Sequence, residues 1–142
     1  MKTKRLIPTL VLFIFIFILS LAIYASAVII DFRGSPGTNK VTLNWSTLSE
    51  LNCKGFEIER GLSTTDFKKI GFVEGAGNST TKTDYLYEDK NVYKSNMDRT
   101  FYYRLIIVDN NNVKTSHSEI VSVTPSISGA RYTWGSIKAL FR

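Results

Sequence analysis

The sequence has little of the chemistry on which metal sites, disulfides and cysteine catalysis depend. It contains one cysteine, Cys53, and one histidine, His117. A single cysteine excludes a disulfide within the chain, although an intermolecular disulfide stays open. One histidine and one distant cysteine fall short of the three or four protein ligands of a zinc site. We therefore expect no metal, no cofactor and a domain that is held together by packing.

The sequence also lacks a concentrated positive charge. The formal net charge is +6, but Lys2, Lys4 and Arg5 lie in the N-terminal segment, so 18 basic residues less three leave 15 against 12 acidic ones. The remaining lysines and arginines are scattered along the sequence. They form no basic stripe with interleaved aromatic residues, a pattern that is typical of nucleic-acid binding surfaces. We expect a solvated surface of mixed sign and no nucleic-acid partner.

The one long hydrophobic run lies at the N-terminus. A basic start precedes an apolar stretch at 10–23 that only Ser20 interrupts, and Ala25-Ser26-Ala27 follows. This order is typical of a secretory signal with its cleavage site. We interpret residues 1–27 as a signal peptide, with an uncleaved anchor as the alternative, because about 20 apolar residues can span a membrane. Either interpretation places the fold outside the cytoplasm (secreted, periplasmic or cell surface), with membrane contact only through an uncleaved segment.

Residues 28–125 predict a single all-β domain without helices. Apolar residues alternate with polar ones in short segments that turn residues separate, which is typical of an antiparallel sandwich. We expect the residues around Pro36 to end the first ladder and residues 75–80 to form a flexible loop. The seven predicted strands are 28–33, 40–46, 55–60, 67–74, 83–89, 100–108 and 113–124.

Alternation also predicts which side chains face the core and which face outward. The predicted core residues are Trp45, Phe56, Ile58, Tyr85, Tyr87, Phe101, Tyr103, Leu105 and Ile107. On the opposite face of the same strands, Glu57 and Glu59 are expected to be solvated. Tyr102 and Arg104 are also expected to face outward, and an exposed aromatic residue beside an arginine marks a candidate contact surface.

Catalytic chemistry finds little support in the sequence. His117 stands among Ser116, Ser118 and Glu119, from which a Ser-His-acid arrangement could be built, but no nucleophile-elbow motif accompanies it. A hydrolase is therefore the last of our hypotheses, and we expect His117 to face solvent and the protein not to be an enzyme. Asn78 begins an Asn-Ser-Thr glycosylation acceptor, which matters only in a cell that glycosylates its exports.

Residues 126–142 predict a linker and a short amphipathic tail. Thr133 is a candidate helix cap, and Trp134, Ile137 and Phe141 follow at spacings of three and four. A helix this short is marginal in water, so we expect its apolar face to dock on a partner. These three side chains are candidate interaction residues.

Several segments in order resemble fibronectin type III-like modules of exported bacterial proteins. In chain order they are Val41 to Trp45, Gly55 to Arg60, Ile70 to Val73 with Gly77 to Thr80, Tyr85 to Asp89, and Tyr102 to Leu105 with Val108 and Asp109. The resemblance implies a seven-stranded antiparallel immunoglobulin-like sandwich that serves as a non-enzymatic interaction or spacer module. We expect the partner to be a protein or a component of the cell envelope. The outward-facing Tyr102 leaves a carbohydrate as the alternative. One departure is Phe101, where the family often has a tyrosine whose hydroxyl secures the corner before this strand.

Overall fold

The structure, a computed structural model, describes residues 26–92 and 99–126, which form an all-β antiparallel fold. Residues 1–25 and the tail with Trp134, Ile137 and Phe141 lie outside the described residues. Within the described part, no helix has the length and apolar character of a membrane span. The strands are β1 (Ser26–Gly37), β2 (Lys40–Gly61), β3 (Phe67–Ser79), β4 (Thr83–Asp89), β5 (Phe101–Asp109) and β6 (Lys114–Val123).

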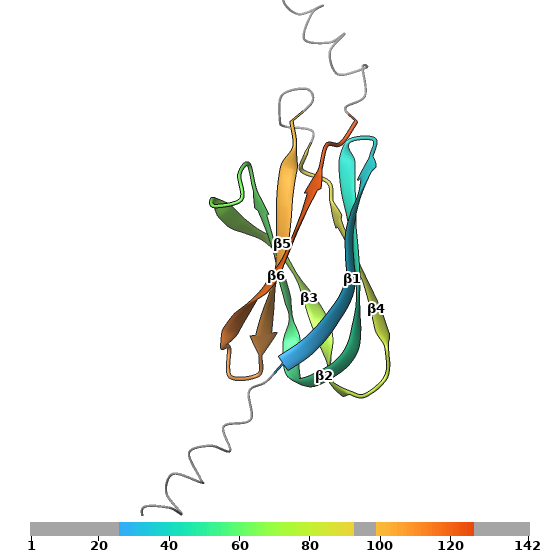
Figure 1. The fold of residues 1–142 in the computed structure, drawn as a ribbon, viewed down its shortest axis with the longest axis vertical. Coiled ribbons are helices and arrows are strands. Elements are labelled where there is room, and N and C mark those ends of the chain that lie inside the picture. Colours follow the sequence, from blue (N-terminus) through green and yellow to red (C-terminus); the bar gives the residue numbers. More distant parts are fainter. Residues whose placement is uncertain (1–25, 93–98, 127–142) are drawn as a thin grey trace, which may run out of the picture.

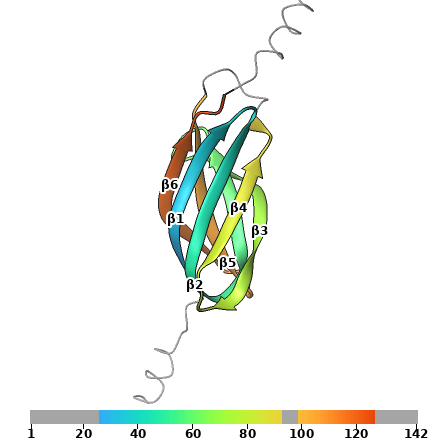
Figure 2. The same ribbon diagram turned by 90° about the vertical axis from the view of Figure 1, so that its right-hand side faces the viewer.

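Strand β2 organises the sheet, because its two halves pair with different neighbours. The first half pairs with β1 and β4, the second half pairs with β3 and β5, and β5 pairs in turn with β6. The sheet curls around β2, as Figure 2 shows, so that the two halves face each other. Trp45 of the first half meets Phe56 of the second half edge to face, with 5.6 Å between the ring centroids. The core lies between the two halves.

The prediction of seven separate strands was wrong in one place, since the described residues form six. The expected loop after residue 46 stays in the ladder, where Ala27 pairs with Glu50, and Cys53 pairs with both Gly77 and Asp109. Asn52 adopts a left-handed conformation with φ 53°, and the register shifts beside it. Such a bulge bends a strand without ending it, so two predicted strands become the single strand β2.

Two predicted breaks in the ladder were also wrong. Pro36 pairs with Val41 inside β1, because β1 is an edge strand and its pairing there does not need the N–H that proline lacks. The expected loop at 75–80 is largely strand, since β3 continues to Ser79. The N–H of Ala76 donates to Glu50 Oε2 at 2.8 Å, which ties this part of β3 to β2.

The predicted core is confirmed. Seven of its nine side chains are buried, while Tyr85 and Tyr87 on β4 are partly buried against the core. The two tyrosine hydroxyls reach the neighbouring edge strand β3. Tyr85 accepts from the N–H of Ala76 at 3.1 Å, and Tyr87 donates to the carbonyl of Ile70 at 2.9 Å. These side chains link β3 to β4, which have no ladder between them.

Tyr103 supplies the corner contact that a phenylalanine at position 101 cannot make. Its hydroxyl donates to Asp89 Oδ2 at 3.0 Å, and Arg60 Nη1 donates to the same oxygen at 2.6 Å. The N–H of Asn91 donates to Oδ1 at 3.0 Å, so the buried carboxylate of Asp89 has partners on both oxygens. Phe101 keeps a packing role, with the Arg60 guanidinium 5.2 Å from its ring centroid.

The chain enters and leaves the described fold at opposite ends. Ser26 pairs with Leu51 where β2 bends, whereas Ser126 pairs with Thr38 beside the turn between β1 and β2. Figure 1 shows the start of β1 at one end of the long axis and the residues after β6 at the other.

Candidate interaction surface

The structure brings Tyr102 and Arg104 to one face of the sheet, as predicted. We call this face, formed by β3, the second half of β2, β5 and β6 and directed away from the core, the outer face. It is built in rows of paired residues: Glu57 lies between Phe72 and Ile106, and Glu59 lies between Lys69 and Arg104. The side chains of this face include Glu57, Glu59, Phe67, Lys69, Phe72, Tyr102, Arg104 and Lys114.

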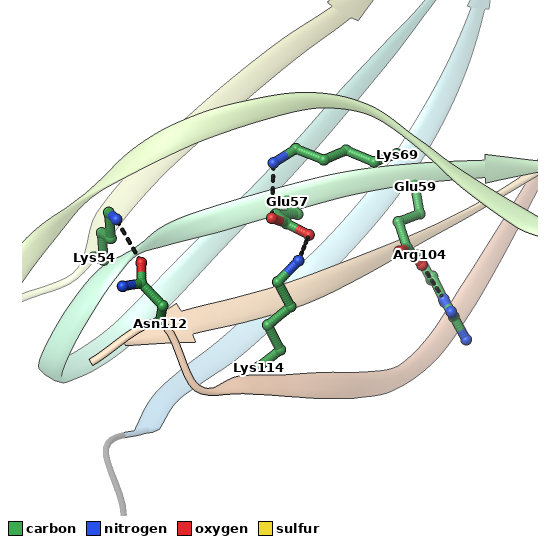
Figure 3. A network of polar contacts seen from close by, with 7 residues as sticks. All are labelled: Lys54, Glu57, Glu59, Lys69, Arg104, Asn112 and Lys114. Carbon is green, nitrogen blue, oxygen red and sulfur yellow. Dashed lines mark hydrogen bonds and ion pairs between the residues drawn. The ribbon is translucent and has the colours of Figure 1, made fainter. Parts of the chain in front are cut away.

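Glu57 is the main correction on this face, because it is buried and not solvated as predicted. Only 5% of the residue is exposed. Lys69 Nζ donates to Oε1 at 2.7 Å from β3, and Lys114 Nζ donates to Oε2 at 2.8 Å from the start of β6. Figure 3 shows the two lysines converging on the carboxylate from opposite sides. Hydrogen bonds from Lys114 and then Lys69 hold the pKa of Glu57 below its usual value, although burial acts in the opposite direction.

A third ion pair holds Arg104 in place. Its Nε donates to Glu59 Oε2 at 2.6 Å, and its guanidinium carbon lies 4.3 Å from the ring centroid of Phe67. Tyr102 is half-buried and pairs with Gly61 on one side and Ser122 on the other. Arg104 is thus oriented by partners on β2 and β3 before any ligand arrives.

The only histidine does not face solvent, so that prediction was wrong. Its ring packs edge to face against Phe32 with 6.4 Å between centroids, and 20% of the side chain is exposed. His117 Nε2 lies 3.6 Å from Glu119 Oε2 and forms no hydrogen bond to a described residue. Across residues 26–92 and 99–126, no three histidine, cysteine, aspartate or glutamate side chains are grouped to hold a metal ion.

Cys53 lies beside another buried carboxylate, that of Glu50, whose burial the sequence did not reveal. Glu50 accepts from Thr47 Oγ1 at 2.7 Å and also accepts from the Tyr85 hydroxyl. Burial, followed by the charge of Glu50 and a hydrogen bond to it, raises the pKa of the Cys53 thiol to about 12. The residue is 1% exposed. The thiol is therefore neutral and shielded, and the intermolecular disulfide that the sequence left open requires local unfolding.

Comparisons with known proteins support the fold alone. No protein-family model matches the chain, and no curated protein matches its sequence. A β-1,2-glucanase from Parabacteroides distasonis is similar over 72% of this chain and 12% of the glucanase, with 17% identity and a TM-score of 0.52. Pectate lyase PelI from Erwinia chrysanthemi is similar over 70% of this chain and 28% of the lyase, with 18% identity and a TM-score of 0.48.

An Fn3-like protein from Clostridium thermocellum is similar over 73% of this chain and 94% of its own length, with 16% identity and a TM-score of 0.46. The chain spans about an eighth of the length of the glucanase and less than a third of the length of the lyase. Likeness at this level of identity describes how strands are arranged, because one fold hosts many unrelated functions.

Proposed function

We propose that this chain is an exported, non-enzymatic fibronectin type III-like module that acts as a spacer or interaction domain at the cell surface or in the extracytoplasmic space. The observation that carries the proposal is the entry of the chain at one end of the fold and its exit at the other. A domain connected in this way separates whatever the N-terminal segment and the C-terminal tail attach to.

The pairing of β2 supports the fibronectin type III-like assignment. If its two halves are counted separately, the described strands make seven segments. Three of them (β1, the first half of β2, and β4) form one half of the sheet, and four (β3, the second half of β2, β5 and β6) form the other. Two facing antiparallel layers with seven segments are the architecture of immunoglobulin-like sandwiches.

Export and attachment are proposed from the segments that flank the fold. N-terminal sequencing of the protein, with separation into membrane and soluble extracytoplasmic fractions, tests export. A mature start at Val28 in the soluble fraction indicates a cleaved signal, and an intact Met1 in the membrane fraction indicates an anchor. Recovery of the intact chain from the cytoplasm would contradict the proposal.

The tail is proposed as the attachment element because its predicted helix has one apolar face. Deletion of 132–142, or replacement of Trp134, Ile137 and Phe141 by serine, is expected to release the protein from its cellular fraction. Replacement of Lys138 and Arg142 by glutamine is the matched control, since it changes the polar side of the same segment. Unchanged fractionation of the serine variant would contradict a role of the tail in attachment.

Carbohydrate binding is the second candidate function. The observation that favours it is the placement of Tyr102 on the same outer face as Phe67 and Phe72, beside cations. Aromatic rings offer flat apolar surfaces to the C–H groups of sugars. Retention on a glycan array that Tyr102→Ala abolishes is the expected result, and an array without any retained glycan would contradict it.

A further inference from the structure

The cleavage site expected from the sequence lies inside the fold. Ser26 pairs with Leu51 and Ala27 pairs with Glu50 at the start of β1. Ala27 is 6% exposed and belongs to the core, so a peptidase cannot reach it once β1 has paired. Cleavage after Ala27 before folding would remove both ladder pairs and one core residue. The fold is therefore complete only in a chain that keeps Ser26 and Ala27.

The uncharged N-terminal segment meets β1 without a linker. Residues 6–25 lie between Arg5 and Ser26 and carry no charge. About 20 apolar residues, roughly 30 Å of helix, cross the hydrocarbon core of a bilayer. A segment that crosses with residues 6–25 leaves none as a spacer, so the fold begins in the headgroup layer. Lys2, Lys4 and Arg5 precede the segment, and basic residues favour the cytoplasmic side, which places the fold outside.

Exposed apolar side chains gather where β1 starts. Leu51, the partner of Ser26, is 49% exposed, and Val28 is exposed two residues further along β1. Leu48 is 54% exposed and is the extra residue of the bulge between β1 and β2. Val113 is 59% exposed in the turn between β5 and β6, which a backbone hydrogen bond of 3.2 Å ties to the bend of β2. Figure 1 shows these segments together at one end of the long axis. We call the surface formed by these four side chains the entry end.

The entry end is unusual in its apolar content and not in its charge. It holds four of the eight large hydrophobic side chains that the described residues expose. The charged side chains on the turns beside it and next to those turns are Lys54, Lys82, Lys114, Glu57, Glu74 and Asp84, while Glu50 and Asp109 are buried. The surface has no excess of positive charge, so anionic lipid is not required. Apolar side chains at a chain entry suit the interface of a zwitterionic bilayer.

We propose that residues 1–25 stay attached as a membrane anchor and that the entry end rests on the lipid surface. The proposal rests on the export proposed above and names the partner of this end of the module. A bilayer is favoured over another protein or a second copy because the chain outside the described fold stops at Ser26, beside these side chains. The fold then stands on the membrane with its C-terminal exit directed away from it, as a spacer requires.

The intact mass of the protein tests the anchor. Cells that express the full chain are separated into membrane and soluble fractions, and we expect the membrane fraction to contain the whole chain from Met1. A chain that begins at Val28, in either fraction, would overturn the anchor.

A fluorophore on the entry end tests the lipid contact. The full-length variant Leu51→Cys is labelled with the polarity-sensitive dye NBD and placed in phosphatidylcholine nanodiscs that contain a lipid with a spin label near its headgroup. Cys53 is buried and does not compete for the dye in the folded protein. Leu62→Cys is the matched control, because Leu62 is 55% exposed but follows Gly61 at the other end of the fold.

We expect blue-shifted emission at position 51 and severalfold stronger quenching by the spin-labelled lipid there than at position 62. Equal quenching at both positions, or none at position 51, would overturn the lipid contact. A dye at position 51 that is shielded from water but not quenched by lipid would identify a protein or a second copy at the entry end and would also overturn it.

Replacement of Leu48 and Val113 by serine tests the apolar basis of the contact. Both side chains are exposed, so the fold is retained, and quenching at position 51 should fall. Leu86→Ser is the control, because Leu86 is 58% exposed on β4, opposite Asn44 and away from the entry end. Unchanged quenching in the serine variant, or a contact that forms only when phosphatidylglycerol is added, would overturn the apolar basis.

These outcomes are separable from those of the proposed function. A chain recovered from the cytoplasm contradicts export, whereas a chain in the membrane whose position 51 stays in water contradicts the lipid contact alone. Attachment through the tail is measured after detergent has dissolved the membrane, so that the anchor does not mask release.

Discussion

Replacement of Tyr103 by phenylalanine removes one hydroxyl from the corner between β4 and β5 and leaves the packing of its ring intact. That hydroxyl donates to Asp89, whose residue is 2% exposed, at 3.0 Å. A hydrogen bond to a charged group contributes about 1.5–3 kcal/mol. Arg60 and the N–H of Asn91 remain on the carboxylate, so it is not left unpaired. We therefore expect the free energy of unfolding to fall by about 1.5 kcal/mol, the lower end of that range.

Equilibrium unfolding in urea measures this loss, and thermal unfolding should show a fall of roughly 6–12 °C for a domain of this size. Tyr102→Phe is the matched control, because its hydroxyl forms no hydrogen bond to a described residue, and its effect should stay within about 0.5 kcal/mol. Asp89→Ala should cost more, about 3–5 kcal/mol, since it leaves the partly buried Arg60 without its anion.

A double-mutant cycle decides whether the effect of Tyr103 passes through Asp89. In the Asp89→Ala background, Tyr103→Phe should have almost no further effect, because the acceptor is already gone. If Tyr103→Phe and Tyr102→Phe destabilise the protein equally, or if Tyr103→Phe costs the same with and without Asp89, the corner contact does not stabilise the fold as argued.

Three further predictions concern the other buried polar groups. Cys53 should resist alkylation at mildly alkaline pH in the folded protein and react fully in urea, because burial and Glu50 raise its pKa to about 12; rapid labelling of the native chain would contradict this. The pKa of Glu57 is lowered in the folded state, so its contribution to stability is present above the unfolded value of 4.5 and is lost as pH falls through the folded value. Urea unfolding across this range should therefore show a weaker acid dependence for Glu57→Gln, and identical pH profiles would argue against the lysine contacts. Tyr87→Phe should cost about 1 kcal/mol in urea unfolding, since it removes the bond to the Ile70 carbonyl, and a neutral result would argue against a link between β3 and β4.

The pattern of apolar residues predicted the strands well where turn residues bound a short apolar or alternating segment. The segments at 83–89, 100–108 and 113–124 match β4, β5 and β6 closely. The first alternates along its length, and 100–108 is an apolar run that turn residues bound, which is typical of a strand buried on both faces. Prediction failed where polar residues continue a ladder. Residues 47–53 and 75–79 have turn-like compositions, yet they pair because Glu50 and the neighbouring strands accept their backbone groups.

Only part of the outer face could be predicted from the sequence, because alternation along a strand is local and contacts between strands are not. The outward placement of Tyr102 and Arg104 follows from alternation on a single strand. The burial of Glu57 does not, because its two lysines come from β3 and from the start of β6, 12 and 57 residues further along the chain. No local sequence pattern predicts that two lysines this distant along the chain contact the same carboxylate.

The sequence by itself determined the all-β class, the core residues and the side of each strand that faces the core, because a side-chain period of two is a local property of the extended chain. Only the tertiary structure decided how many strands form, since a bulge at Asn52 keeps β2 continuous. It also decided the partners of Glu50, Glu57 and Asp89. A buried carboxylate is tolerated only when donors reach it, and those donors come from several strands that the fold alone brings together.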